Sequence, residues 1–327
     1  MNDQITKKRV VAIGGGNGSA IALEALKQHR DIFDISAVIS MSDSGGSSGR
    51  LRQEFNTLPP GDILRAILSL SLSDYPVLRK IFYSNRFSGA GKLAEHNLGN
   101  LFLTLAGKYA GDFMSAVRAL EQSVEAVGHV YPATLDQTDL CVELENGQII
   151  KTEAAIDMPN YDRSLKIKKA WLEPAGQIYS EAREALAAAD YIIFSPGSIY
   201  TSIIAAILPA GVKTAIAQSK AKLIFSIGNA YIKDGETGPT TVSGAIQTLE
   251  KYLPRKLDLT LLSDTKLSDI QKAVNEKRGW EVFTDDCENQ DGLNIVRTDY
   301  RKEDGCLCSD KLGKILREVI GDKLKIN

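Results

Sequence analysis

The fold is decided by an early stretch that reads Arg9-Val10-Val11-Ala12-Ile13-Gly14-Gly15-Gly16-Asn17-Gly18-Ser19. Its apolar first half predicts a short buried strand, and a helical pattern follows from Ala20 to His29. Strand, glycine turn and helix in this order form the first unit of a doubly wound α/β sheet. The turn resembles a dinucleotide-binding fingerprint, but Ser19 stands where a third Gly or Ala is expected. Because a helix start attracts anions, the turn predicts a phosphate site.

A second glycine-rich turn follows the next apolar run, Ile35 to Met41, and reads Asp43-Ser44-Gly45-Gly46-Ser47-Ser48-Gly49-Arg50. Glycine lets backbone N–H groups approach an anion closely, and serine hydroxyls add further donors. Asp43 falls at a strand end, where open α/β sheets bind ligands, and Arg50 can set a guanidinium against phosphate. The two turns together predict one wall of a nucleotide pocket. A solvated Gly/Ser loop without a ligand is the alternative.

Two further polar clusters stand at predicted helix starts. Gly61 and Asp62 follow two prolines, and Asp62 suits either helix capping or ligand contact. His96-Asn97-Leu98-Gly99-Asn100 precedes an apolar helix predicted from Leu101 to Tyr109. Three polar side chains beside a bare backbone suit hydrogen bonding to a base, ribose or phosphate. Taken alone, this second cluster would be a helix cap plus a surface histidine.

The α/β pattern resumes with a helix from Ser180 to Ala189 and a strand from Tyr191 to Phe194. A third strand–turn–helix junction follows, with Ser195, Pro196, Gly197, Ser198 and Thr201 before and within a helix from Ile199 to Ile207. The next strand, Lys222 to Ile227, ends in Gly228-Asn229, and the polar loop after it contains Glu236 and Thr237. These strand ends extend the same predicted pocket.

The rest of the chain predicts a helix from Phe113 to Val127 and a hairpin from Leu140 to Ile150, with Asn146-Gly147 as its turn. We interpret residues of about 130–176 as a β excursion from the main sheet. Further strands are expected at Leu257 to Leu262 and Leu293 to Arg297, and helices at Thr240 to Tyr252 and Lys311 to Ile320. The expectation is a single α/β domain over 1–327, a mostly parallel sheet with helices on both faces and a looser tail at 265–327.

Composition narrows the class of protein. The chain has 327 residues, 43% hydrophobic and 24% charged, with a net charge of −2. This near-neutral balance argues against a nucleic-acid partner and against an anionic membrane surface. No apolar run reaches membrane-spanning length, so no membrane insertion is expected. The first nine residues lack the apolar core of a signal peptide, and we expect a cytoplasmic location.

Cysteine and histidine usage favours neither a metal centre nor a protease. Cys287, Cys306 and Cys308 match no structural zinc spacing and have no histidine nearby in sequence, so no metal-ligand set is assigned. The segment around Asp43 and Ser47 resembles the nucleophile region of trypsin-like proteases. Those enzymes are β-barrels with a histidine base, whereas this chain alternates strands and helices.

Taken together, the motifs resemble the family of YvcK-like gluconeogenesis or morphogenesis factors, which is related to the 2-phospho-L-lactate transferases (CofD-like proteins). The pieces that match are Gly14 through Gly18, Asp43 through Leu51, Pro59 through Ile63, His96 through Leu101, Tyr131 through Thr134, Ser195 through Ser202, and Gly235 through Thr237. Their order and spacing cover nearly the whole chain up to about residue 264.

The resemblance implies a Rossmann-like fold and a pocket for a uridine nucleotide sugar such as UDP-N-acetylglucosamine. By position, Gly15, Gly16 and the loop from Gly45 to Gly49 would hold diphosphate, and the neighbourhoods of Ser195 and Asn229 would hold base or ribose. Two positions depart from the family pattern: Ser44 replaces a second aspartate, and Leu64-Arg65 stands where an asparagine is common. One carboxylate plus hydroxyls is a poor Mg²⁺ site, so the case for Mg²⁺ at Asp43 is weak.

Two functions are carried forward. The first is a nucleotide-sugar-binding factor that links carbon metabolism to cell-envelope synthesis without turnover. The second is a transferase of phosphoryl or phospho-acyl groups, in which Asp43 would be catalytic. An NAD-dependent oxidoreductase fits the first glycine turn only. No protein partner is identified, and a homo-oligomer is compatible with the chain. The candidate ligand-binding residues are Gly14, Gly15, Gly16, Asn17, Gly18, Asp43, Gly45, Gly46, Ser47, Ser48, Gly49, Arg50, Gly61, Asp62, His96, Asn97, Asn100, Ser195, Pro196, Gly197, Ser198, Thr201, Gly228, Asn229, Glu236 and Thr237.

Overall fold

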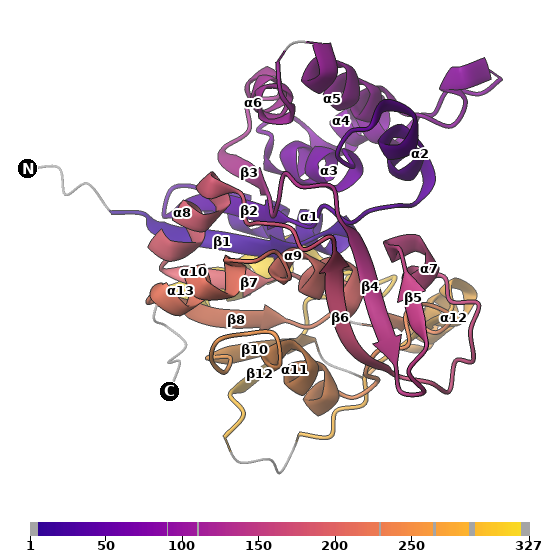
Figure 1. Cartoon of the computed structure of the whole chain (residues 1–327). Helices are drawn as coiled ribbons and strands as arrows, with labels where there is room; N and C mark the ends of the chain where they lie inside the picture. The colour runs from indigo at the N-terminus through magenta and orange to yellow at the C-terminus, as the bar shows by residue number, and fades with distance from the viewer. Residues whose placement is uncertain are drawn as a thin grey trace, which may run out of the picture.

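A seven-stranded sheet forms the centre of the computed structural model, which describes residues 6–89, 91–109, 111–228, 230–263, 266–287 and 292–321. The strand order is β12-β10-β8-β7-β1-β2-β3, and every neighbouring pair runs parallel (Figure 1). The strands are β1 Lys8–Gly14, β2 Phe33–Ile39, β3 Gly128–Pro132, β7 Tyr191–Phe194, β8 Lys222–Ser226, β10 Leu259–Ser263 and β12 Ile295–Thr298. The predicted α/β fold with a parallel sheet is confirmed.

Helices cover both faces of this sheet, and β1 shows why. Val10 and Ala12 point into one hydrophobic core, while Val11 and Ile13 point into the other. A strand buried on both faces therefore appears as a continuous apolar run. The first core packs against α1 Gly16–Lys27, α3 Gly61–Leu70, α5 Leu98–Tyr109, α6 Phe113–Ser123 and α13 Ser309–Ile320. The second packs against α8 Ser180–Ala188, η3 Ile199–Ile204, α9 Ala205–Ile207, α10 Val212–Gln218 and α11 Val242–Glu250.

The strand order places a switch point between β1 and β7. The chain leaves β1 toward β2 on one side, and β7 pairs with β1 on the other side. In open α/β sheets, ligands bind in the crevice outside the carboxyl ends of the strands at such a point. The first and third predicted turns follow β1 and β7 and therefore face each other across it.

A small antiparallel sheet forms the predicted β excursion, with β4 Asp139–Leu144 between β5 Ile149–Lys151 and β6 Ile167–Glu173. Its buried side packs on the second core through residues such as Val142 and Leu172. In Figure 1 it lies with α7 Glu153–Asp157 to the right of the main sheet. Residues 128–132, part of which we had assigned to the excursion, belong instead to the main sheet, because β3 pairs with β2.

Both glycine-rich turns prove to be helix starts rather than loops ahead of helices. Helix α1 begins at Gly16, four residues before the expected Ala20, and α2 Gly46–Phe55 takes in most of the second turn. Buried Leu51 anchors α2 to the core, so the serines before it wind into helical turns. The expected helix from Phe113 ends at Ser123, because Ala126 bridges back to Ser71 and Val127 donates to Leu70.

The C-terminal region contains a helix and a short strand that were not expected from the sequence. Helix α12 Asp269–Arg278 begins with a capping box formed by Ser268 and Gln271, and β11 Trp280–Glu281 pairs with β9 Tyr231–Ile232. Sequence periodicity missed α12 because its buried residues do not form an apolar stripe; Asn275 alone is buried. The short segments α4 Tyr75–Leu78, η1 Arg79–Ser84 and η2 Gly91–Leu93 complete the helical region around α5.

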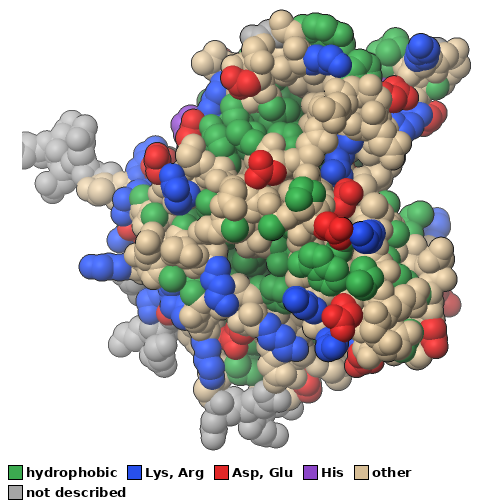
Figure 2. All heavy atoms as spheres, in the orientation of Figure 1, with side chains coloured by type: hydrophobic (Ala, Val, Ile, Leu, Met, Phe, Trp, Pro, Cys, Tyr) green, Lys and Arg blue, Asp and Glu red, His purple; other side chains and the backbone are tan. Residues whose placement is uncertain are grey.

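The surface carries charges of both signs without a single-sign field on the face shown in Figure 2. Acidic and basic side chains are interspersed there with small apolar patches. Within the described residues, no helix combines the length and the apolar composition that a membrane crossing requires.

Candidate functional site

One large cavity of about 1160 Å³ opens at the carboxyl ends of β1, β7 and β8. Ligand pockets commonly measure about 300–1,000 Å³, so this cavity can hold a ligand as large as a nucleotide sugar. Loops from distant parts of the sequence meet in it. The predicted site residues that line it are Gly15, Gly16, Asn17, Gly18, Asp43, Asp62, Pro196, Gly197, Ser198, Thr201, Gly228, Glu236 and Thr237.

The start of α1 supplies backbone donors to the cavity. The first N–H groups of a helix have no intrahelical partner. Helix α1 itself supplies neither a capping side chain nor an acidic residue in its first turn, and the nearby Asp62 carboxylate, 2.7 Å from the Cβ position at Gly15, is ion-paired with Arg65. Gly16 has a φ of +64°, which favours glycine at the position where the chain turns into the helix. This end of α1 is therefore suited to bind an anion.

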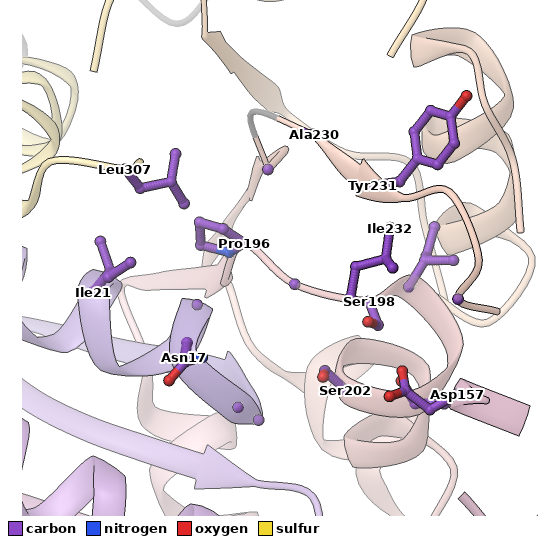
Figure 3. Close-up of a pocket in the computed structure, with 18 of the residues that line it drawn as sticks. Asn17, Ile21, Asp157, Pro196, Ser198, Ser202, Ala230, Tyr231, Ile232 and Leu307 are labelled. Carbon is purple, nitrogen blue, oxygen red and sulfur yellow. The ribbon is translucent and has the colours of Figure 1, made fainter. Parts of the chain in front are cut away.

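The turn after β7 packs directly against the start of α1. A Cβ atom added to Gly18 would lie 1.7 Å from the carbonyl oxygen of Pro196, so only glycine permits this approach. Figure 3 shows Asn17 of α1 below Pro196, with Ser198, Ser202 and Asp157 to the right of both. The first and third predicted turns thus form one continuous wall.

Glu236 forms hydrogen bonds with backbone N–H groups at the start of η3, in the third strand–turn–helix junction. Its carboxylate accepts hydrogen bonds from the backbone N–H groups of Tyr200 and Thr201, the latter at 3.0 Å. Burial raises the pKa of Glu236 to about 7, although these hydrogen bonds oppose the rise. Thr237 pairs with the hydroxyl of Tyr161 at 3.1 Å. Both side chains therefore bind protein groups: Glu236 holds the 233–240 loop against η3, and Thr237 holds it against Tyr161.

Carboxyl groups gather on the opposite side of the cavity. Burial, with a further contribution from Asp62, raises the pKa of Asp43 to about 6. Burial and the nearby Asp43 raise the pKa of Glu153 to about 8, and Glu153 accepts a hydrogen bond from the backbone of Ser44 at 3.2 Å. Burial also raises the pKa of Asp157. All three groups can accept hydrogen bonds from ligand hydroxyls, and Asp43 and Glu153 can exchange protons near neutral pH.

The second glycine turn contributes only Asp43 to the cavity. Ser47, His96 and Asn100 instead bind one another in a buried cluster: the Ser47 hydroxyl lies 2.8 Å from His96 Nδ1 and accepts from Asn100 Nδ2 at 3.0 Å. Arg50 donates to the carbonyl oxygen of Ala94. The cluster fastens α2 to the start of α5, and the Ser47 hydroxyl, His96 Nδ1 and Asn100 Nδ2 bind one another instead of the cavity.

The structure therefore separates part of the predicted set from the cavity wall. The residues that do not line it are Gly14, Gly45, Gly46, Ser47, Ser48, Gly49, Arg50, Gly61, His96, Asn97, Asn100 and Ser195. Asn229, the remaining candidate, lies outside the described residues. Ser195 and Gly61 stand immediately behind the wall, since Ser195 packs on Gly14 and Gly61 on Ser48 and Asp43.

Sequence reasoning missed several wall residues. Tyr231, Trp280 and Phe283 form an aromatic side, with the rings of Tyr231 and Phe283 5.2 Å apart. They come from β9, β11 and the loop that follows β11, and a two-residue strand is too short to show periodicity. Arg65 was also missed, although it follows Asp62 by three residues and forms an ion pair with it. Basic side chains at the rim include Arg79, Lys80, Arg163 and Lys166.

Comparison with known proteins gives consistent matches over most of the chain. A family model described as 2-phospho-L-lactate transferase CofD matches residues 10–301. A Thermotoga maritima protein named "Putative gluconeogenesis factor" is 39% identical over 86% of this chain and 87% of its own length. The gluconeogenesis factor of Listeria monocytogenes is 32% identical over 88% of this chain and 91% of its own length. An X-ray structure of a Bacillus halodurans protein, 31% identical, superposes with a TM-score of 0.85 over 95% of this chain and 99% of that one.

Proposed function

The chain belongs to the CofD family, alongside its gluconeogenesis factors, and from this premise we propose that it binds a uridine nucleotide sugar of the UDP-N-acetylglucosamine type. In this proposal the protein senses the ligand and does not turn it over. It acts in the cytoplasm, where it links carbon metabolism to cell-envelope synthesis and cell shape.

The observation that carries the proposal is the paired wall made by α1 and the turn after β7. Uncapped N–H groups of α1 face the cavity from Gly16 onward, and Gly197 and Ser198 adjoin them. A diphosphate bound there gains from the helix dipole and from backbone donors that cost no side-chain entropy. The glycines allow its oxygens to approach the backbone.

The two remaining sides of the cavity suit the two ends of such a ligand. The aromatic side at Tyr231, Trp280 and Phe283 offers flat apolar surface for a pyrimidine base. The carboxyl groups of Asp43 and Asp157 offer acceptors to the hydroxyl groups of a sugar. A polar ligand with an aromatic end and a hydroxyl-rich end matches this distribution.

Thermal shift followed by isothermal titration tests the proposal. We expect UDP-N-acetylglucosamine to raise Tm more than ATP, GTP and NAD do at equal concentration, because a ligand that binds only the folded state stabilises it. Incubating UDP-N-acetylglucosamine with the protein should release no product. Equal shifts for all nucleotides would contradict uridine selectivity, and loss of the sugar during incubation would contradict sensing without turnover.

One observation favours a second candidate, a transferase of the 2-phospho-L-lactate transferase type. Asp43 lies in the cavity with a pKa of about 6, which suits a group that accepts a proton from an attacking hydroxyl. In that case Asp43→Asn would abolish metal-supported release of a nucleotide product while the cavity still bound the nucleotide. Full activity of Asp43→Asn would remove this candidate.

A further inference from the structure

We propose that Arg65 supplies the positive charge that a divalent cation would otherwise bring to the ligand's diphosphate, so that binding in this cavity is independent of Mg²⁺. The inference rests on the proposed function in one respect: it assumes that an anionic group binds at the start of α1. It adds the residue that recognises that group and the way its charge is balanced.

Arg65 is held as a rigid buried cation. Its Nη1 lies 3.3 Å from Asp62 Oδ1, and its Nη2 donates to the hydroxyl of Tyr83. The guanidinium carbon lies 4.7 Å from the centre of the Tyr83 ring, and 14% of the side chain is exposed. A guanidinium fixed from two sides loses little rotamer freedom when a ligand arrives.

This cation stands next to the proposed anion site. Arg65 lines the cavity, and its Nη1 is 3.7 Å from the Cβ position at Gly16, the first residue of α1. Arg65 Nε is buried and has no hydrogen-bond partner among the described residues. Nη1, which carries a second N–H besides the one directed at Asp62, is therefore the charged donor nearest the uncapped backbone of α1, and a guanidinium N–H beside backbone N–H groups is an arrangement that recognises a phosphate oxygen.

The surrounding residues do not fit a Mg²⁺ site. Asp62, one of the carboxylates that line the cavity, is ion-paired with Arg65. Asp43 accepts a hydrogen bond from the backbone of Gly45 at 3.0 Å, and the Ser44 hydroxyl accepts one from Ala154. Across the described ranges, no three Asp, Glu, His or Cys side chains are grouped as a metal would need. The Arg65 guanidinium, which lies within ion-pair distance of Asp62, would also repel a divalent cation bound at that carboxylate.

Arg65 remains charged in this setting. Burial lowers the pKa of Arg65, but Asp62, Tyr83 and Asp43 together outweigh burial and raise it.

Isothermal titration of the full chain with UDP-N-acetylglucosamine and, separately, with inorganic pyrophosphate tests the inference, each in excess Mg²⁺ and in EDTA. We expect the wild type to bind with the same Kd in both buffers. Arg65→Gln should weaken binding of both probes about 10- to 100-fold, as expected for a lost charge-assisted hydrogen bond. The matched control is Arg52→Gln, because Arg52 is also mostly buried and ion-paired, with Asp139, but lies outside the cavity wall.

Two variants keep the test independent of folding. Asp62→Asn/Arg65→Gln removes both charges of the pair and leaves no buried carboxylate unpaired, and Tm shows whether it folds. Ser44→Asp/Arg65→Asn adds a carboxylate next to Asp43 and removes the guanidinium, so this variant should bind the probes only when Mg²⁺ is present. Wild-type binding that requires Mg²⁺, wild-type affinity in Arg65→Gln, or no binding of either probe overturns the inference. Arg65-dependent binding of pyrophosphate without uridine selectivity would leave it standing and remove the nucleotide-sugar proposal.

Discussion

Replacing Glu153 by Gln should change how the stability of this protein depends on pH. Burial and Asp43 raise the pKa of Glu153 from 4.5 to about 8 in the folded state. A carboxyl group with a raised folded pKa stabilises the fold below its unfolded pKa, and this stabilisation is lost as the pH rises through the folded value. The wild type should therefore become less stable between about pH 4.5 and pH 8.

The size of the effect follows from linkage. One pKa unit corresponds to about 1.4 kcal/mol, so a group shifted this far costs the wild type ~3 kcal/mol of unfolding free energy between pH 5 and pH 7. Gln cannot ionise, yet its side-chain oxygen still accepts the hydrogen bond from the Ser44 backbone. Glu153→Gln should therefore lose less stability over that range.

Urea unfolding at closely spaced pH values, followed by tryptophan fluorescence and circular dichroism, measures the difference. Subtracting the variant's unfolding free energy from that of the wild type cancels contributions from other titrating groups. Glu184→Gln, which alters an exposed glutamate of α8, should give a curve parallel to the wild type. If Glu153→Gln also runs parallel, burial of this carboxyl group does not govern its protonation and the electrostatic account of the acidic side is wrong.

Three other substitutions test packing and capping. Gly18→Ala places a methyl group 1.7 Å from Pro196 O, so the turn after β7 must move. We expect the free energy of unfolding to fall by about 1–3 kcal/mol and isothermal titration to show at least tenfold weaker binding of UDP-N-acetylglucosamine. Ser47→Ala leaves buried His96 Nδ1 and Asn100 Nδ2 without their shared partner, so the free energy of unfolding should fall by about 1–3 kcal/mol, measured as a lower urea midpoint. An unchanged midpoint would mean that the cluster does not stabilise the fold. Ser268→Ala removes the capping box of α12 and should cost about 1 kcal/mol, visible as faster amide exchange in α12, while exchange in α1 stays unchanged.

The order of the elements could be predicted because its signals are local. The apolar run before Gly14 marks a strand buried on both faces, and Asn146-Gly147 marks a hairpin turn, since both depend only on neighbouring residues. The clustering of Gly15, Asp43, Gly197 and Glu236 around one cavity was also anticipated from the rule that ligands bind at the carboxyl ends of parallel strands.

What each polar group does in the cavity was decided by tertiary contacts alone. The sequence alone gives no reason to prefer Asn17 over Ser47, His96 or Asn97 as a ligand-binding residue. In the structure, α2 packs on α5, and Ser47 and His96 form hydrogen bonds within that contact. Tyr231 and Phe283 meet across 52 positions of sequence, and Arg65 is fixed at the cavity wall because Tyr83 packs over its guanidinium. Local sequence patterns specify which secondary-structure elements form and where they lie along the chain. The partner of a buried polar side chain depends on which distant segment arrives beside it, and no local pattern records that.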